Sequence, residues 1–151
     1  MTEVAFYQLE ISPLERALPK LLEKTLAAGK RALVLASSYE RVEFLNVQLW
    51  IYKSESWLPH GSESDGSPEN QPIWIGTSGD KNPNNSQFIF LTDGATSDHL
   101  NEFERCFEIF DGRDATSIKA ARIRWKKYLE LGHKLTYWHQ NETGVWIKKE
   151  S

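Results

Sequence analysis

The sequence has few residues able to form covalent cross-links or metal clusters. Only one of its 151 residues is a cysteine, Cys106. A single thiol excludes an internal disulfide and any metal cluster held by several cysteines, so we expect Cys106 to be a small core residue. The four histidines show no metal-binding spacing on any expected helix or strand. We therefore expect no metal ion and no cofactor.

Long hydrophobic runs are also missing. No apolar stretch approaches the ~18–20 residues that cross a bilayer, and the first residues, MTEVAFYQLE, do not resemble a secretory signal peptide. Hydrophobic residues make up 40% of the chain and charged residues 26%, values typical of soluble globular proteins. We therefore expect a cytoplasmic protein with one domain spanning residues 1–151.

Glycine-rich phosphate-binding motifs are absent. The sequence contains no G-x-G-x-x-G, and AAGKR at 27–31 lacks the first glycine and the Ser/Thr of a P-loop. This segment also follows an expected helix rather than a strand, so we interpret it as a helix end with basic residues near the negative end of the helix dipole. The sequence therefore does not indicate a nucleotide cofactor.

Apolar segments alternate with amphipathic segments along the chain. Strands are expected at 4–9, 31–36, 72–76 and 87–92, and helices at 12–28, 37–51, 98–105 and 116–131. Residues 106–110 are either the end of the third of these helices or a strand. This order predicts an α/β fold, a three-layer sandwich with a mainly parallel, Rossmann-like central sheet in a single domain.

Several local features complete this prediction. Ser12 and Ser37 each begin an S-x-x-E capping pattern, so each is expected to cap a helix. Residues 61–70 and 79–86 are polar and are expected to be loops, and 133–149 is expected to be an extended tail or a hairpin. Trp50 and its neighbours are expected either in the core or at an interface, and we favour the core.

The net charge of −3 is unevenly distributed. Between residues 113 and 134 seven basic residues stand against two acidic ones, so this stretch carries +5 and the rest of the chain −8. The basic residues are Arg113, Lys119, Arg122, Arg124, Lys126, Lys127 and Lys134. A positive patch on a negative protein attracts anions to one place.

Helical spacing separates two faces of segment 116–131. The face expected to pack on the sheet comprises Ile118, Ala121, Trp125, Tyr128 and Leu129. Lys119, Arg122 and Lys126 form a cationic stripe along one flank of it. An apolar floor with a cationic rim suits a peptide that ends in an aromatic residue with a free carboxylate.

Two other functions remain open from the residues alone. Single-stranded nucleic acid also fits such a surface through base stacking and phosphate pairing, although the pI of about 5.8 and the small basic patch argue against it. A small α/β enzyme using His60, which lies beside a loop in WLPHG, is the third possibility. No nucleophile or carboxylate is recognisably paired with His60, so no catalytic residues are assigned.

The sequence resembles the chi subunit family of bacterial DNA polymerase III holoenzyme. The matching segments follow one another over nearly the whole chain: AFYQL, GKRALVLA, LW at 49–50, WLPHG at 57–61, PIWI, FIFLT and ARIRWKKYLELGHKLTYW at 121–138. The Pro-His pair and the Arg-x-x-aromatic-Lys helix ending in glycine are the most specific of these.

This resemblance implies a non-catalytic replication adaptor of the clamp loader. Members of the family bind the acidic C-terminal tail of single-stranded DNA-binding protein, which ends in Pro-Phe, and bind the psi subunit. Carried over by position, the resemblance places the following residues in or beside the tail-binding pocket: Arg122, Trp125, Lys126, Trp57, Lys119 and Gly132. Leu129 and Ile118 depart from the family pattern, because basic residues occur at these positions in some members.

Overall fold

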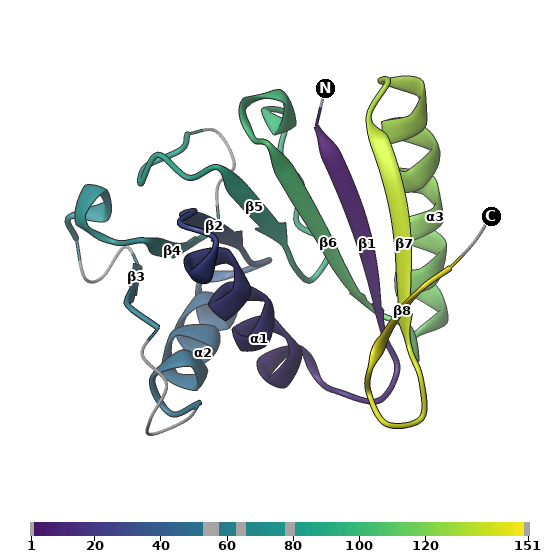
Figure 1. Cartoon of the computed structure of the whole chain (residues 1–151), viewed down its shortest axis with the longest axis horizontal. Coiled ribbons are helices and arrows are strands. Elements are labelled where there is room, and N and C mark those ends of the chain that lie inside the picture. The colour runs from purple at the N-terminus through teal and green to yellow at the C-terminus, as the bar shows by residue number, and fades with distance from the viewer. Residues whose placement is uncertain (1, 53–57, 63–65, 78–80, 150–151) are drawn as a thin grey trace.

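An eight-stranded sheet runs through the molecule, as shown by a computed structural model that describes residues 2–52, 58–62, 66–77 and 81–149 (Figure 1). The strands are β1 (Glu3–Leu9), β2 (Ala32–Leu35), β3 (His60–Ser62), β4 (Ile73–Gly76), β5 (Phe88–Leu91), β6 (Arg105–Asp111), β7 (Lys134–Gln140) and β8 (Trp146–Lys148). Their spatial order is β3-β4-β2-β5-β6-β1-β7-β8. Within the described residues β7 and β8 pair antiparallel, and the other pairings are parallel.

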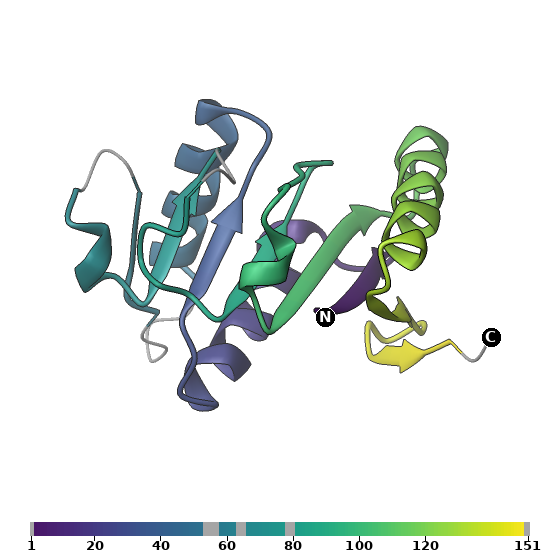
Figure 2. The same cartoon turned by 90° about the horizontal axis from the view of Figure 1, so that it is seen from above.

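Three α-helices complete the sandwich. They are α1 (Leu14–Ala27), α2 (Tyr39–Trp50) and α3 (Ala115–Glu130), with short 3-10 turns at η1 (Pro68–Asn70) and η2 (Leu100–Glu102). Helices α1 and α2 share a core with one face of the sheet, whereas α3 packs on the other face. The predicted α/β class with a mainly parallel central sheet is confirmed. Figure 2 shows α2 and α3 at opposite ends of the molecule.

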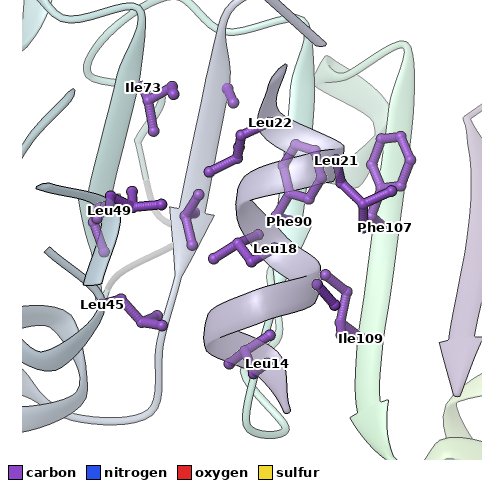
Figure 3. Close-up of a cluster of buried hydrophobic side chains, with 14 of the residues drawn as sticks. Leu14, Leu18, Leu21, Leu22, Leu45, Leu49, Ile73, Phe90, Phe107 and Ile109 are labelled. Atoms are coloured by element: carbon purple, nitrogen blue, oxygen red, sulfur yellow. The ribbon is translucent and has the colours of Figure 1, made fainter. Parts of the chain in front are cut away.

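Continuous apolar strands lie at the centre of the sheet because both of their faces are covered. All four residues of β2 and of β5 are buried. Leu18 and Leu22 of α1 pack on the first face of the sheet, in the same core as Phe90 (Figure 3). Burying a side chain of this size contributes about 1.5–3 kcal/mol.

The second face is built mainly from β1, β5 and β6, with α3 packed over its β1 end. Phe6, Cys106 and Phe110 point to this side, and Tyr128 of α3 packs against them. Cys106 is completely buried, so its predicted role as a small core residue is confirmed. Burial and the neighbouring Glu108 carboxylate raise the pKa of its thiol, which keeps it protonated.

Two predicted features of segment 98–111 are decided by the structure. The helix expected over 98–105 is wrong, because only the turn η2 forms there and β6 begins at Arg105. In β6 alternate residues face opposite sides of the sheet, with Cys106 and Glu108 on one side and Phe107 on the other. This period of two is that of a strand, and it resolves the ambiguity at 106–110.

Both predicted helix caps are also wrong. Pro13, in extended conformation, is the N-cap of α1, and Ser12 instead donates its backbone N–H to the side chain of Gln140. The α2 cap is Ser38, one residue after Ser37, and its hydroxyl accepts the backbone N–H of Arg41 at 3.2 Å.

Two apolar residues expected to be buried lie on the surface. Trp50, expected in the core, is 65% exposed near the end of α2. Leu129, expected on the sheet-facing side of its helix, is 53% exposed, whereas Ala121 and Tyr128, expected on the same side, are buried.

The expected loop 61–70 contains the end of β3 and the turn η1, and 133–149 forms the strands β7 and β8. In the part of the chain that the structure describes, no helix is both long and apolar enough to span a bilayer.

Candidate functional site

Four of the predicted site residues lie on helix α3, which packs on the second face of the sheet. They are Lys119, Arg122, Trp125 and Lys126. The N-terminus of α3 is capped by Asp114, whose carboxylate accepts the N–H of Thr116 at 3.3 Å. The helix ends at Glu130, and Gly132, two residues later, has a φ of +85°. There the N–H of Gly132 donates to Leu129 O and that of His133 donates to Tyr128 O. Gly132 therefore ends the helix in the left-handed conformation that glycine adopts without strain.

Trp125 forms the apolar part of the α3 surface. Its ring lies edge-on to Phe6 of β1, with 5.2 Å between ring centroids, and to Tyr137 of β7, at 5.9 Å. The side chain is only half-buried, so part of the indole remains open to solvent. The three rings make a floor between α3 and the two strands.

The cations of α3 lie beside this floor. Lys119, Arg122 and Lys126 are all exposed, and among the described residues none of the three forms an ion pair. Burial raises the pKa of Tyr137, and the positive charge of Arg122 opposes that rise. The guanidinium of Arg122 is therefore close enough to interact electrostatically with the phenol. We call this surface, made of Lys119, Arg122, Trp125, Lys126 and Tyr137, the α3–β7 surface.

Tyr137 was not predicted from the sequence. It sits on β7, next to α3, and its hydroxyl donates to the side-chain oxygen of Gln8 on β1. The ammonium of Lys149 lies 5.6 Å from the centre of its ring. The cluster of aromatics in LTYW was the available signal, but only the parallel pairing of β7 with β1 places Tyr137 beside Trp125.

Trp57, the second predicted aromatic of the pocket, lies outside the described residues. Its described sequence neighbour Leu58 packs into the first-face core. The next strand, β3, is at the opposite edge of the sheet from β7 and β8. The geometry of the α3–β7 surface is therefore described without Trp57.

Arg124 belongs to the interior rather than to the cationic stripe. Its Nε donates to the Oε2 of Glu108 at 2.9 Å, and the Tyr128 hydroxyl donates to the same oxygen at 2.7 Å. Burial raises the pKa of Glu108, while Arg124 and Tyr128 oppose the rise. These contacts join α3 to β6 and hold the helix in place.

A cavity of about 530 Å³ at the carboxyl ends of β1 and β6 is the position where α/β proteins commonly bind ligands. Three arginines line it, but each already has a carboxylate partner: Arg41 with Asp93, Arg113 with Asp111, and Arg124 with Glu108. Because these charges are compensated, the cavity offers less attraction to an anion than the exposed stripe does.

His60 is held in place by backbone carbonyls. Its Nδ1 lies 2.6 Å from Leu58 O and its Nε2 lies 3.1 Å from Asn46 O. Trp50 covers the ring at a centroid distance of 4.5 Å. The imidazole is buried, and each ring nitrogen lies within hydrogen-bond distance of a backbone carbonyl oxygen, an arrangement typical of a structural histidine rather than of a general base. No group of three or more potential metal ligands occurs in the described parts of the chain.

The fold and the site together define an α/β domain that presents an anion-attracting aromatic surface at one end. Residues 1–136 match the family model described as DNA polymerase III chi subunit, HolC. The chain belongs to this family, whose members are accessory subunits of the replicative polymerase. It is also similar to a protein of Rickettsia prowazekii (strain Madrid E) named probable DNA polymerase III subunit chi, with 28% identity over 98% of this chain and 92% of the relative.

Proposed function

We propose that this chain is a non-catalytic adaptor that links the clamp loader of DNA polymerase III to single-stranded DNA-binding protein by binding its acidic C-terminal tail. Membership of the chi family supports a role in replication. The observation that carries the choice of partner is the α3–β7 surface, where cations without an ion pair among the described residues lie beside a half-exposed tryptophan.

Each residue of the surface has a role in this proposal. Arg122 pairs with the terminal carboxylate of the tail, because a guanidinium matches a carboxylate with two parallel hydrogen bonds. Trp125 and Tyr137 receive the terminal phenylalanine ring, and Lys119 and Lys126 attract the aspartates. Micromolar affinity is typical of one anchored ring with a charge-assisted pair.

One further residue enters the proposal only through the family resemblance. Gly132 is proposed to lie at the end of the tail-binding pocket, where it allows the chain to turn from α3 into β7. Trp57 is left out of the α3–β7 surface, because Leu58, which follows it, packs into the first-face core and β3 lies at the opposite edge of the sheet from β7.

Titration calorimetry with a peptide copying the tail tests the proposal. Arg122→Ala should weaken binding by about 1.5–3 kcal/mol, because it removes a charged hydrogen-bond partner. Lys127→Ala is the matched control, since it removes a cation from the same helix at a position directed toward Leu100 and His133. A peptide lacking its final phenylalanine should bind far more weakly than the full tail. Equal affinity of the wild type and Arg122→Ala would exclude the site.

Direct binding of single-stranded DNA through α3 is the alternative function of the same surface. It requires that Lys119→Glu with Lys126→Glu abolish binding of an oligonucleotide in the absence of any partner protein. The adaptor proposal requires that this double variant lose the tail peptide instead, with the loss growing smaller at high salt as the charges are screened.

A second partner, the psi subunit, is proposed to dock on α2. Val47, Trp50 and Ile51 are all more than half exposed on or just after this helix, a concentration of apolar surface that monomeric proteins rarely leave uncovered. Since α2 and α3 lie at opposite ends of the molecule (Figures 1 and 2), both partners can bind at once. Trp50→Ser should reduce psi binding at least about 10-fold, in line with loss of an interface anchor, and leave tail-peptide affinity unchanged. Unchanged psi binding would place psi elsewhere.

A further inference from the structure

A second groove lies on the sheet face opposite α3. It has a volume of about 530 Å³ and runs between α1 on one side and the β7–β8 hairpin on the other, over β6 and β1. In Figure 1, α1 lies in front of the sheet, whereas no helix stands in front of β1 and β7. The groove shares no residue with the α3–β7 surface.

Aromatic rings form the floor of this groove. Tyr7 of β1 stacks nearly parallel on Trp138 of β7, with centroids 5.9 Å apart and 9° between the ring planes. Trp146 of β8 stands edge-on to Tyr7, with 4.8 Å between ring centroids. Phe107 of β6 also lies beside Tyr7, at a centroid distance of 5.8 Å. Trp138 and Trp146 remain half-exposed, so ring surface is available to a ligand.

The rim of the groove is cationic. Lys20 and Lys24 project from α1 one helical turn apart, about 6 Å along the axis, and both are exposed. Arg105 lies over the Phe107 ring at 4.8 Å. No carboxylate occurs among the described residues that line the groove. Lys20 and Lys24 form no ion pair among the described residues, whereas Arg105 is paired with Glu3, with 4.0 Å between Nε and Oε2.

Aromatic floors with cationic rims bind single-stranded nucleic acid, because bases stack on the rings and phosphates pair with the cations. An acidic peptide would also meet the charge, but it needs hydrogen-bond partners for its backbone. Two of the side chains able to supply them are occupied: Gln140 Oε1 accepts three backbone N–H groups, and the Thr25 hydroxyl donates to Leu21 O. Stacked bases need only ring faces, so the lining favours nucleic acid.

We propose that the groove between α1 and the β7–β8 hairpin binds a short run of single-stranded DNA, with bases on Trp138 and Trp146 and phosphates on Lys20, Lys24 and Arg105. This activity goes beyond tail binding and does not depend on it. A strand held there leaves the α3–β7 surface on the other face free for a protein partner.

Fluorescence anisotropy of a labelled twelve-residue oligo-dT, titrated with the full chain between 20 and 200 mM salt, tests the proposal. Lys20→Glu with Lys24→Glu should weaken binding at least about 10-fold. Losing two phosphate contacts should also reduce the slope of log affinity against log salt by about 1.4. Both lysines are exposed on α1, so the variant leaves the core intact.

The matched control is Lys119→Glu with Lys126→Glu, which makes the same change in net charge on α3. Its affinity for oligo-dT should stay within about 2-fold of the wild type. An equal loss in both double variants, or a loss only in the α3 variant, would overturn the groove as the binding site. So would a wild-type chain that shows no binding at 20 mM salt.

A third variant separates stacking from charge. Trp146→Ala should weaken oligo-dT binding about 10-fold, the loss of one stacked base, with no change in the salt slope. Thymidine monophosphate should compete only at concentrations far above those of the oligonucleotide, because it makes one phosphate contact instead of several. Competition at equal concentration would show a mononucleotide site and overturn the assignment to a DNA strand.

Discussion

Arg124 and Glu108 form an ion pair inside the protein, with 2.9 Å between Nε and Oε2. The Glu108 side chain is 1% exposed and that of Arg124 is 12% exposed. A charged pair in this position connects the middle of α3 to the middle of β6. Arg122 and Lys126, the exposed cations two residues before and after Arg124, therefore sit on a helix whose position on the sheet is fixed by a specific contact as well as by apolar packing.

Replacing Arg124 by alanine should destabilise the fold strongly. The substitution leaves the Glu108 carboxylate buried without its cation, a change that costs about 3–5 kcal/mol. Urea unfolding followed by circular dichroism measures it. Lys127→Ala, on the exposed part of the same helix, should change the free energy of unfolding by less than about 0.5 kcal/mol. Similar values for the two variants would show that the ion pair contributes little.

The cost of Arg124→Ala should depend on pH. Burial raises the pKa of Glu108 above its ordinary value of 4.5, so the folded state favours the protonated acid. The stability contributed by this protonation is fully present below about pH 4.5 and is lost as pH rises through the raised pKa. A protonated Glu108 does not need Arg124, so the variant should lose less stability at pH 4.5 than at pH 7.5. A loss independent of pH would contradict this account.

Gln140 should be important for the loop between β1 and α1. Its Oε1 accepts the backbone N–H groups of Glu10, Ile11 and Ser12 at 2.9–3.1 Å. Gln140→Leu leaves these donors without a partner and should cost about 2–4 kcal/mol in thermal or urea unfolding. Gln140→Glu keeps an acceptor oxygen in place and should cost clearly less. An equal loss in both variants would indicate that packing, not the hydrogen bonds, is what Gln140 supplies.

Two glycines beside α3 should differ in their tolerance of alanine. A Cβ on Gly132 meets no atom within 4 Å, so Gly132→Ala costs only the left-handed backbone strain, about 1–2 kcal/mol. A Cβ on Gly112 would contact the Gln8 side chain and lie 2.7 Å from Leu9 O, which forces the backbone to move. Gly112→Ala should therefore cost more, about 2–3 kcal/mol. Unfolding of the two variants side by side checks the order, and a reversed order would contradict it.

His133 should make the fold sensitive to mild acid. Its Nδ1 accepts the backbone N–H of Thr2 at 3.4 Å, which requires an unprotonated nitrogen, and burial lowers its pKa below 6.5. The stability from the neutral ring is present above pH 6.5 and is lost as pH falls through the lowered pKa. His133→Asn keeps an acceptor but does not titrate. The difference in melting temperature between wild type and variant should therefore change between pH 7.5 and pH 5, and a constant difference would exclude this role.

Much of the fold was predictable from local patterns. The apolar runs at β2 and β5 indicate strands covered on both faces, and the spacing of Leu14, Leu18 and Leu22 indicates an amphipathic helix. These features depend on neighbours within a few residues, which the sequence displays directly. The α1 cap was misplaced by one residue because the backbone N–H of Ser12 is held by Gln140, 128 positions away.

The candidate site was predictable only in part. The cationic stripe of α3 follows from helical spacing alone, since Lys119, Arg122 and Lys126 recur every three or four residues. Tyr137 could not be assigned to the same surface, because its position depends on the pairing of β7 with β1. The ion pair of Arg124 with Glu108 could not be predicted either, since Glu108 lies on another element and a charged residue is unusual in a buried strand.

The sequence by itself determined the α/β class, the order of most elements and the concentration of positive charge on one helix, because hydrophobic period and net charge are local properties of the chain. The tertiary structure alone decided which aromatics gather beside that charge, that Arg124 faces inward while Arg122 faces outward, and that a second cationic groove lies across the sheet. Those outcomes depend on which strands become neighbours, and strand order is set by packing between segments far apart in the chain.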